Sequence, residues 1–197
     1  MLQFHNLESL SANQSLLDNM LQDRRRQFIE RLKWDIQQDK NGREYDEYDN
    51  EHARYVMWVG EQGEHLGSLR VSQTSKQCMI EDHFAADFCP KNLTETGNWE
   101  VTRFCTSPIL ARKSHSKVSS QLIKGLGLFG IDCNVMNYFG LCYSSMLRVY
   151  ARLGWPPNAI QPSCKDKNLL MTTWNVIPSE FPKLYLPHHH EESLRAA

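Results

Sequence analysis

The sequence predicts an α/β (α+β) protein, a single domain over residues 1–197 in which helices flank a mixed central β-sheet. Two observations support this. A segment with helical periodicity precedes two strands spaced as a hairpin, and strands then alternate with helices from residue 99 onward. No internal repeat or low-complexity linker interrupts this pattern, which indicates one domain.

The N-terminal segment has apolar residues at steps of four, seven and four, which predicts an amphipathic helix over residues 13–33: Leu17, Leu21, Phe28 and Leu32. The dipeptide Asn41-Gly42 then breaks the chain, and an acidic loop follows. We expect the hairpin next, with strands at 54–59 and 65–71 joined by a turn at 61–64.

Residues 72–98 are predicted to be irregular, with a short apolar stretch near 84–88. Further elements are then expected in alternation: strand 99–106, helix 116–130, strand 135–143, helix 144–154 and strand 169–177. We expect the helix at 144–154 to be capped by a serine and to end at Gly154, because two prolines follow.

Composition excludes several classes of protein. The formal net charge of −1 argues against bulk nucleic-acid binding, and no apolar run approaches the ~18–20 residues of a membrane span. The six cysteines form no C-x-x-C pair, so a reduced, cytoplasmic protein is favoured over a disulfide framework. The N-terminus lacks the features of a secretory signal. No metal site is expected, since His188–His190 lie in a polar tail.

Charge is unevenly distributed along the chain. Residues 24–33 carry five basic side chains and one acidic, net +4, whereas residues 39–51 carry six acidic and two basic, net −4. A second basic cluster comprises Arg112, Lys113, Lys117 and Lys124. Such polarity favours separate sites for differently charged ligands, although scattered surface charge explains any single run equally well.

Five motifs in order then resemble a known family. They are Arg24-x-x-x-Phe28 followed by Trp34, Glu44-x-Asp46-x-x-Asp49, Arg70 in GSLRV, Glu100-x-x-Arg103, and MLRVYARLGW. Each motif alone is weak, but their order and spacing together resemble the acyl-homoserine-lactone synthases, the autoinducer synthases of bacterial quorum sensing. The resemblance covers most of the chain.

The resemblance implies a fold similar to the N-acetyltransferases (GNAT-like), a three-layer sandwich whose sheet is splayed to admit a pantetheine arm. It implies two substrates, S-adenosylmethionine and an acyl thioester on acyl carrier protein, with no tightly bound cofactor. It assigns S-adenosylmethionine binding to a more mobile part at 1–52, an acyltransferase-like sheet core to 53–180, and a polar tail to 181–197.

Residue roles follow from the same resemblance. The expected catalytic residues are Glu100, Arg103 and Asp46, with Glu100 as the general base for the attacking amine. The expected S-adenosylmethionine contacts are Arg24, Phe28, Trp34, Asp46, Asp49 and Arg70. Asp49 could instead orient an arginine. Phe28 and Trp34 are equally explained as core residues, and the acidic loop as an exposed one.

Strand geometry adds a condition. Regular alternation along 99–106 puts Glu100 and Thr102 on one face and Arg103 on the other. Both charged residues can serve one site only if a β-bulge re-aims the chain. Without a bulge, Arg103 is expected to be a structural partner of the acidic loop.

The acyl chain and its carrier are assigned to two further sets. The expected acyl-pocket walls, all of which are also ordinary core residues, are Thr102, Leu122, Met136, Gly140, Leu141 and Met146. The expected carrier-protein contacts are Arg112, Lys113, Lys117, Arg148 and Arg152. Glycine at 140 offers no hydrogen-bond donor to a 3-oxo group, which favours an unsubstituted chain. The segment ARKSHSKVSS lacks the glycine-rich loop that cradles coenzyme A, which favours carrier protein over acyl-coenzyme A.

Two alternatives remain open at this point. One is an N-acyltransferase on the same scaffold that closes no lactone. The other is a nucleic-acid- or protein-binding module that uses the basic first helix. Such a module has no need of Asp46, Asp49, Glu100 and Arg103 together, and release of methylthioadenosine distinguishes the two enzymes.

Overall fold

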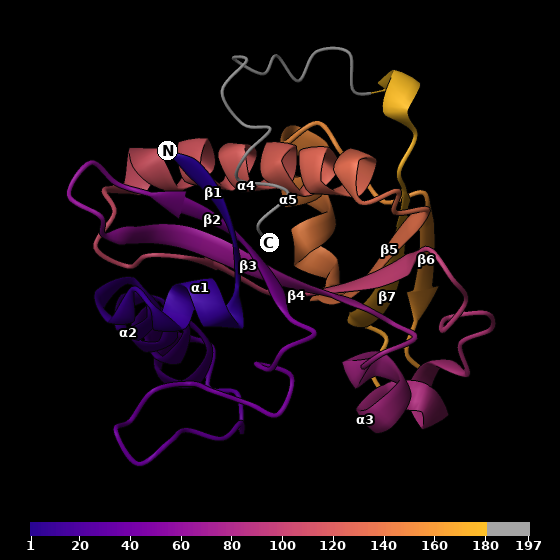
Figure 1. The fold of residues 1–197 in the computed structure, drawn as a ribbon. Helices are drawn as coiled ribbons and strands as arrows, with labels where there is room; N and C mark the ends of the chain where they lie inside the picture. Colours follow the sequence, from indigo (N-terminus) through magenta and orange to yellow (C-terminus); the bar gives the residue numbers. More distant parts are fainter. Residues whose placement is uncertain (181–197) are drawn as a thin grey trace. The chain divides into compact units, whose positions relative to one another are not determined.

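The computed structural model describes residues 1–180, so the predicted tail at 181–197, with its three histidines, lies outside the described residues (Figure 1). Within residues 1–180 the strands form one mixed sheet of order β1-β2-β3-β4-β5-β7-β6. Pairing is antiparallel for β1–β2, β5–β7 and β6–β7 and parallel for β4–β5. The strands are β1 (Leu2–Asn6), β2 (Arg54–Val59), β3 (His65–Gln73), β4 (Asn98–Thr106), β5 (Asn137–Tyr143), β6 (Ala159–Pro162) and β7 (Leu169–Asn175).

The chain divides into two compact units. Within the described residues, unit 1 contains Met1–Arg70 and Arg103–Gly125, and unit 2 contains Val71–Thr102 and residues 126–180. The helices are α1 (Leu7–Ser11), α2 (Gln14–Arg25), α3 (Met79–Phe88), α4 (Arg112–Asp132) and α5 (Leu147–Arg152). Between residues 1 and 180, no helix has the length and apolar character needed to cross a bilayer.

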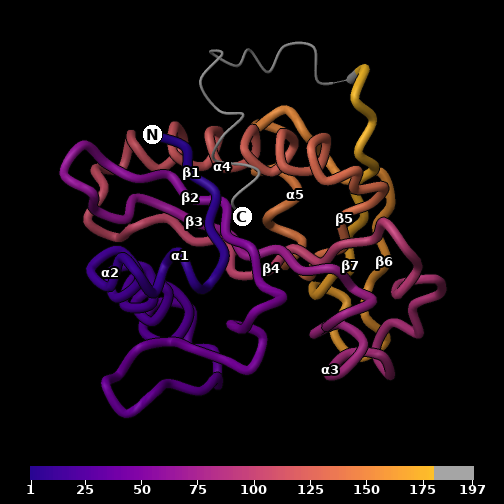
Figure 2. The backbone as a smooth tube through the Cα atoms, viewed as in Figure 1, coloured from indigo at the N-terminus to yellow at the C-terminus, as the bar shows by residue number. Residues whose placement is uncertain are grey.

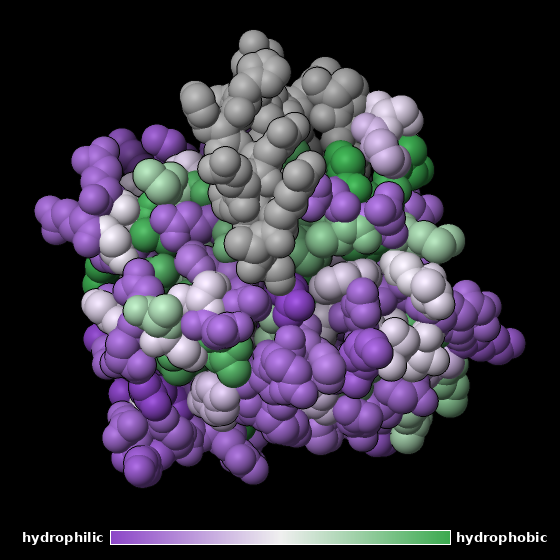
Figure 3. Space-filling view, in the orientation of Figure 1, coloured by the Kyte–Doolittle hydropathy of each residue, from purple (hydrophilic) through white to green (hydrophobic). Residues whose placement is uncertain are grey.

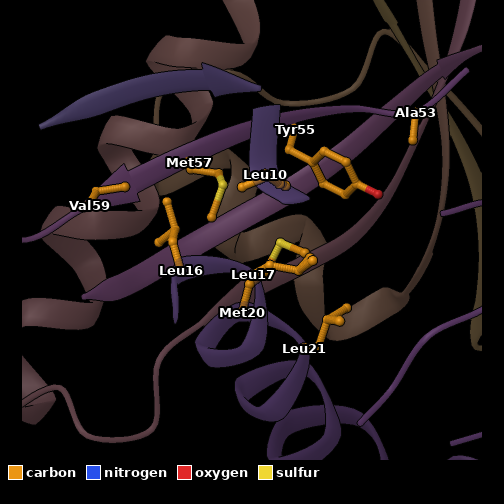
Figure 4. Packing of buried hydrophobic residues seen from close by; sticks show 9 residues of the cluster. All are labelled: Leu10, Leu16, Leu17, Met20, Leu21, Ala53, Tyr55, Met57 and Val59. Carbon is orange, nitrogen blue, oxygen red and sulfur yellow. The ribbon is translucent and has the colours of Figure 1, made fainter. Parts of the chain in front are cut away.

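In unit 1, α1 and α2 cover one face of the first strands. Leu16, Met20 and other apolar residues of α2 pack against Tyr55 and Met57 of β2 (Figure 4). The side chain of Asn13 caps the helix by accepting from the N–H of Leu16. The helical segment expected over 13–33 begins as predicted. After Arg25, however, it widens into a π-helix, η1 (Arg26–Arg31), which the apolar spacing does not reveal.

The first half of α4 covers the other face of these strands. A side chain at Gly125 would place its Cβ 2.6 Å from both Leu2 of β1 and Val56 of β2. A Cβ at Gly67 of β3 would likewise lie 2.7 Å from Val118 of α4. These two glycines therefore allow helix and strands to approach more closely than any side chain permits.

Unit 2 also has two covered faces. On one face, α3 packs its apolar side through Ile80 and Phe88 against Met171 of β7, with Phe139 and Leu141 of β5 partly buried beside them. On the other face, the Tyr138 hydroxyl donates to the carbonyl of Leu126 in α4 at 3.0 Å, and Tyr150 of α5 meets Trp174 edge-on. The sheet is thus sandwiched here as in unit 1 (Figure 1).

Some expected elements differ from those observed. Helix α3 lies in the stretch 72–98 that was expected to be irregular. The elements β1, α1 and β6 were not predicted, because the first two are only five residues long and all four residues of β6 are exposed. The last helix starts as a 3-10 turn, η2 (Ser144–Met146), without the expected serine cap. Gly154, with φ of 87°, ends it as expected.

Candidate active site

The acidic loop of unit 1 lies within the long connection from η1 to β2 (Figure 2), and it closes on Arg24 at the end of α2. The Nη1 and Nη2 atoms of Arg24 donate to the two oxygens of Asp49, both at 2.8 Å. Its Nε donates to Glu44 at 2.5 Å. All three side chains are buried, so the guanidinium meets its carboxylates in a bidentate, desolvated geometry.

Two more arginines reach the same loop from β3 and β4. Arg70 donates to both oxygens of Asp46, at 3.1 Å from Nη2, and its Nη1 lies 3.0 Å from Asp49. Arg103 donates through Nε to Glu44 at 3.0 Å and through Nη2 to Asp46 at 2.7 Å. Six charged side chains therefore meet in what we call the acid–arginine cluster: Arg24, Glu44, Asp46, Asp49, Arg70 and Arg103.

The acid–arginine cluster balances three guanidinium groups against three carboxylates. Burial opposes the charge of Arg24, but Asp49 and Glu44 outweigh it and raise the pKa of Arg24 well above its usual value. Burial opposes the charge of Asp49 in the same way, and Arg24 with Arg70 holds the pKa of Asp49 below its usual range. Both signs of charge are therefore kept in the interior.

Asp46, the expected ligand contact, has both oxygens engaged by the protein. One oxygen accepts from Arg70 and from the backbone N–H of Tyr48. The other accepts from Arg70 and from Arg103. Because a carboxylate offers about four lone-pair sites, these four bonds fill them. Direct contact between Asp46 and a substrate cation stays a prediction, and it requires exchange of one of these bonds.

Tyrosines of unit 1 complete the surroundings of the cluster. The Tyr55 hydroxyl donates to a carboxylate oxygen of Asp49 at 2.8 Å, and the Tyr45 hydroxyl donates to the Asp49 carbonyl at 2.6 Å. The ring of Tyr48 lies 5.7 Å from the guanidinium carbon of Arg70, within cation–π range. The tyrosines threaded through the acidic stretch thus hold the cluster together.

An aromatic pair lies beside the cluster. Phe28, on the π-helix η1, stacks on Trp34 with ring centroids 4.9 Å apart. The Phe28 ring also lies 5.7 Å from the guanidinium carbon of Arg103. Phe28 is buried and Trp34 half-buried, so one ring belongs to the core while the other remains partly accessible. The expected wall of Phe28 and Trp34 is therefore adjacent to the expected charged residues.

Arg103 interrupts the regular alternation of β4. Its φ of 54° is left-handed, a conformation that residues other than glycine rarely adopt. Such a residue within a strand re-aims the side chains that follow, as a β-bulge does. The strain is of the order of 1–2 kcal/mol, and the charge-assisted hydrogen bonds to Glu44 and Asp46 offset it.

Glu100, three residues earlier on β4, has partners of another kind. In unit 2 its two oxygens accept from the backbone N–H groups of Met79 and Ile80, at 2.9 and 2.8 Å. These are the first residues of α3, and the residue before them, Cys78, provides no side-chain cap. Glu100 is 1% exposed and so acts as the cap of α3 from 20 residues away. Its expected role as general base is not tested by this geometry.

The expected acyl-pocket residues belong to both units. In unit 1, Leu122 is fully buried and faces Gly67 of β3. In unit 2, Thr102 is buried, Leu141 packs beside α3, and Met146 is half-buried. The Met136 side chain is 61% exposed and lies over Gly97. Its expected place in the acyl pocket stays a prediction.

Gly140 on β5 lies close to β4. A Cβ there would lie 3.1 Å from the carbonyl oxygen of Val101 and 3.4 Å from the ring of Trp174. The parallel pairing of β4 with β5 runs from Asn98 to Glu100 on β4. Glycine therefore allows a closer approach of β5 to the Val101 carbonyl than a residue with a side chain would.

The expected carrier-protein contacts are all on the surface. Arg112, Lys113 and Lys117 are exposed on the first turns of α4 in unit 1. Just before them, Ile109 is 71% exposed, an apolar side chain beside a basic group. Arg148 and Arg152 are exposed on α5 in unit 2. Hydrophilic residues predominate on the face in Figure 3, with hydrophobic ones in small groups among them.

Comparison with known proteins decides the family. A family model described as autoinducer synthase matches residues 7–179. A curated acyl-homoserine-lactone synthase from Pseudomonas fluorescens is 34% identical over 146 residues, 72% of this chain and 70% of that protein. The chain belongs to the autoinducer synthase family. A curated acyl-homoserine-lactone synthase from Rhizobium etli is 29% identical over 180 residues, 89% of this chain and 84% of that protein.

Solved structures support the fold of this autoinducer synthase. The coenzyme-A-dependent acyl-homoserine lactone synthase BjaI, solved with S-adenosylmethionine and isopentyl-coenzyme A, superposes with a TM-score of 0.74 at 19% identity, covering 98% of this chain and 88% of that one. A putative N-acetyltransferase from Lactobacillus plantarum gives 0.58 at 12% identity, covering 90% and 98%. The N-acetyltransferase-like fold predicted from sequence is confirmed.

Sequence reasoning missed several residues of this autoinducer synthase's site. Glu44 was noted in the acidic motif but given no role, although it joins Arg24 to Arg103. Tyr55 was seen only as a strand residue, yet its hydroxyl is bound to Asp49. No local signal identifies such partners, since only the folded chain shows which carboxylate a distant arginine or tyrosine meets. In residues 1–180, no group of three or more His, Cys, Asp or Glu side chains is arranged to hold a metal.

Proposed function

We propose that this chain is an acyl-homoserine-lactone synthase that joins an acyl chain to S-adenosylmethionine. The methionine amine attacks the thioester carbonyl, so that a C–N bond forms and the C–S bond breaks, and the thiol leaves with a proton. The carboxylate of the acylated product then attacks its own γ-carbon. The C–S bond of the sulfonium breaks and methylthioadenosine leaves, which closes the lactone.

The observation that carries this proposal is the acid–arginine cluster. Its six side chains come from four separate segments: α2, the acidic loop, β3 and β4. These segments hold the motifs by which the sequence resembles the synthases. A merely solvated acidic loop does not bury its carboxylates against three arginines.

The aromatic pair and the cluster suit the two kinds of charge on S-adenosylmethionine. A sulfonium is attracted to an aromatic face by about 0.5–2 kcal/mol, and the Phe28–Trp34 pair offers such a face. The acid–arginine cluster is electrically balanced, so we propose that its carboxylates orient the arginines and that the cluster forms one wall of the S-adenosylmethionine site. An arginine held in this way can donate two hydrogen bonds to the methionine carboxylate of the substrate. The substrate amine can then donate to a carboxylate of the cluster in place of one of its present donors.

The role of Glu100 as general base is also a proposal. A base must lie within hydrogen-bond reach of the amine or of one bridging water. The N–H groups of Met79 and Ile80 donate to the two oxygens of Glu100. We propose that these bonds fix the direction of the carboxylate while it accepts the proton.

The acyl donor is proposed to be a thioester of acyl carrier protein. Basic side chains around an exposed apolar one suit a partner with an acidic, partly apolar face, and Ile109 beside Arg112 and Lys113 fits that description. The segment before α4 has no glycine-rich loop for a pyrophosphate. The acyl chain is proposed to be unsubstituted at its third carbon, since Gly140 offers no donor.

The donor experiment compares two thioesters. Purified protein is supplied with S-adenosylmethionine and either octanoyl-acyl carrier protein or octanoyl-coenzyme A, and lactone and methylthioadenosine are measured by mass spectrometry. We expect both products with the carrier protein. Thiol release without methylthioadenosine would instead identify an N-acyltransferase that closes no lactone, and neither product with either thioester would refute the proposed function.

Charge reversal on α4 then tests the docking surface. The double variant Lys113→Glu/Lys117→Glu is expected to raise KM for the carrier-protein thioester about tenfold or more, with KM for S-adenosylmethionine unchanged, because repulsion replaces attraction at the rim. Lys124→Glu, also exposed on α4, is the matched control. The assignment of this surface to the carrier protein would be contradicted if Lys124→Glu raised this KM as much as the double variant does. It would also be contradicted if the double variant left this KM unchanged.

A further inference from the structure

A second network of buried polar side chains lies in unit 1, next to the acid–arginine cluster. Asp23 Oδ2 lies 2.9 Å from Nδ1 of His65, and Nε2 of His65 lies 2.9 Å from Oγ of Ser68. All three residues are buried. Neither the family motifs nor the proposed reaction uses this Asp23–His65–Ser68 chain.

The order of groups is that of a nucleophilic triad, in which an acid orients a histidine beside a serine. The burial of Ser68 excludes that use, because it is 2% exposed and a substrate carbonyl cannot reach its hydroxyl. The hydrogen-bonded series Asp23–His65–Ser68 must therefore have a structural role within the protein. A charged Asp23 only accepts hydrogen bonds, so Nδ1 of His65 carries the proton that it shares with Asp23.

Asp23 is held from two sides. Its Oδ2 accepts from His65, and its Oδ1 accepts from Nη1 of Arg26 at 3.0 Å. Burial opposes the charge of Asp23, but the hydrogen bonds from His65 and Arg26 hold its pKa below the usual value. Asp23 thus remains a charged anchor between α2 and β3.

The sequence neighbour of this anchor is Arg24. Successive residues of an α-helix project about 100° apart, as 3.6 residues per turn dictates. Asp23 reaches β3 through His65 while Arg24 reaches Asp49 in the acidic loop. Two buried charged contacts at that angle fix the rotation of α2 about its axis. Two residues after Arg24 the helix changes to the wider η1, which carries Phe28.

We propose that His65 is a positioning residue for the S-adenosylmethionine site: through Asp23 it holds the end of α2 so that Arg24 and Phe28 face the acid–arginine cluster. The inference rests on the proposed function, because it deepens the account of that same site. Without the His65 bond, Asp23 keeps its bond to Arg26, whose side chain is partly exposed and belongs to η1 itself. The link from α2 to β3 is then lost.

Two substitutions at His65 separate its two hydrogen bonds. The amide nitrogen of His65→Asn occupies the place of Nδ1 and can still donate to Asp23, while the bond to Ser68 is lost. The longer His65→Gln places its amide near the former Nε2, so it keeps Ser68 and loses Asp23. Ser68→Ala is the matched control, because it removes only the serine hydroxyl that bonds to Nε2 of His65.

Kinetics give the first readout. We expect His65→Gln to raise KM for S-adenosylmethionine about tenfold with kcat and the acyl-donor KM within about threefold of the wild type, the signature of a binding defect. His65→Asn and Ser68→Ala are expected to stay close to the wild type. Equal KM values in all three variants, or a larger defect in His65→Asn than in His65→Gln, would overturn the proposal.

Hydrogen exchange gives a second readout that does not depend on turnover. Amides of residues 20–31 are expected to exchange faster in His65→Gln than in His65→Asn, because only the former loses the anchor. If the wild-type protein makes no methylthioadenosine, the proposed function fails while this exchange difference still reports the link from Asp23 to His65. Equal exchange in the two variants would overturn the positioning role alone.

Discussion

Glu100 and Arg103 stand three residues apart on β4, and they are held by different kinds of partner. Glu100 meets backbone N–H groups at the start of α3, whereas Arg103 meets the side-chain carboxylates of Glu44 and Asp46. The first arrangement ties one charge to a helix end. The second ties three charges of each sign together, so removal of one member leaves an uncompensated charge in the interior.

The largest expected effect follows from removing one carboxylate of the acid–arginine cluster. Asp49→Asn leaves three buried guanidinium groups facing two carboxylates, and we expect it to lower the free energy of unfolding by about 3–5 kcal/mol. Urea unfolding at pH 7 measures this loss. A loss below about 1 kcal/mol would show that water reaches the cluster and screens it.

The same variant has a defined pH dependence. The pKa of Asp49 is lowered on folding, so its contribution is fully present above the unfolded value of about 4 and is lost as pH falls toward the folded value. The difference in unfolding free energy between wild type and Asp49→Asn should therefore shrink on acidification below about pH 4. A difference that stays constant across that window would contradict the ion-pair account.

A smaller effect is expected where the partners are backbone groups. Glu100→Gln exchanges one acceptor oxygen for a donating NH2 group that faces the N–H of Met79 or Ile80, which costs about 1–3 kcal/mol. Hydrogen exchange should show faster opening confined to α3. Glu100→Asp keeps the charge and is the control. Unchanged protection of α3 in the Gln variant would show that Glu100 is not its cap.

The smallest effect on stability is expected from a solvent-accessible group of ion pairs around Arg43, next to the acidic loop. Arg43 bonds to Asp39 and Asp18, and none of the three side chains is buried. We expect Arg43→Ala to lower the unfolding free energy by no more than about 1 kcal/mol, as solvent screens such pairs. A loss comparable with that of Asp49→Asn would remove burial as the explanation for the difference between the two.

These two modes of holding a charge also explain what the sequence could predict. The strands near 54–59 and 99–106 are predicted from apolar spacing. The grouping of Asp46, Asp49 and Arg103 is implied by the resemblance to the synthases, and regular alternation alone would not have predicted it. Helix α3 was missed because its first turn lacks a local side-chain cap. The cap comes from Glu100, far along the chain, and no local pattern reveals it.

Other omissions have similar physical causes. The π-helix η1 keeps the same apolar residues as an α-helix, so periodicity does not distinguish the two. Met136 is expected in the acyl pocket for its apolar side chain, but an apolar residue type does not reveal that this side chain is 61% exposed. His65 lies in a strand whose alternation predicts only an exposed or buried side, and its partner Asp23 belongs to a helix 42 residues away.

The close approach of α4 to Leu2, permitted by Gly125, packs the opening strand β1 against this helix. β1 pairs along its length with β2, from Leu2 opposite Trp58 to Asn6 opposite Arg54. Deleting those first residues would leave the N–H and C=O groups of β2 open to other chains, and open sheet edges promote aggregation. Shortened forms of the protein are therefore expected to self-associate, and affinity handles are best placed well away from this strand.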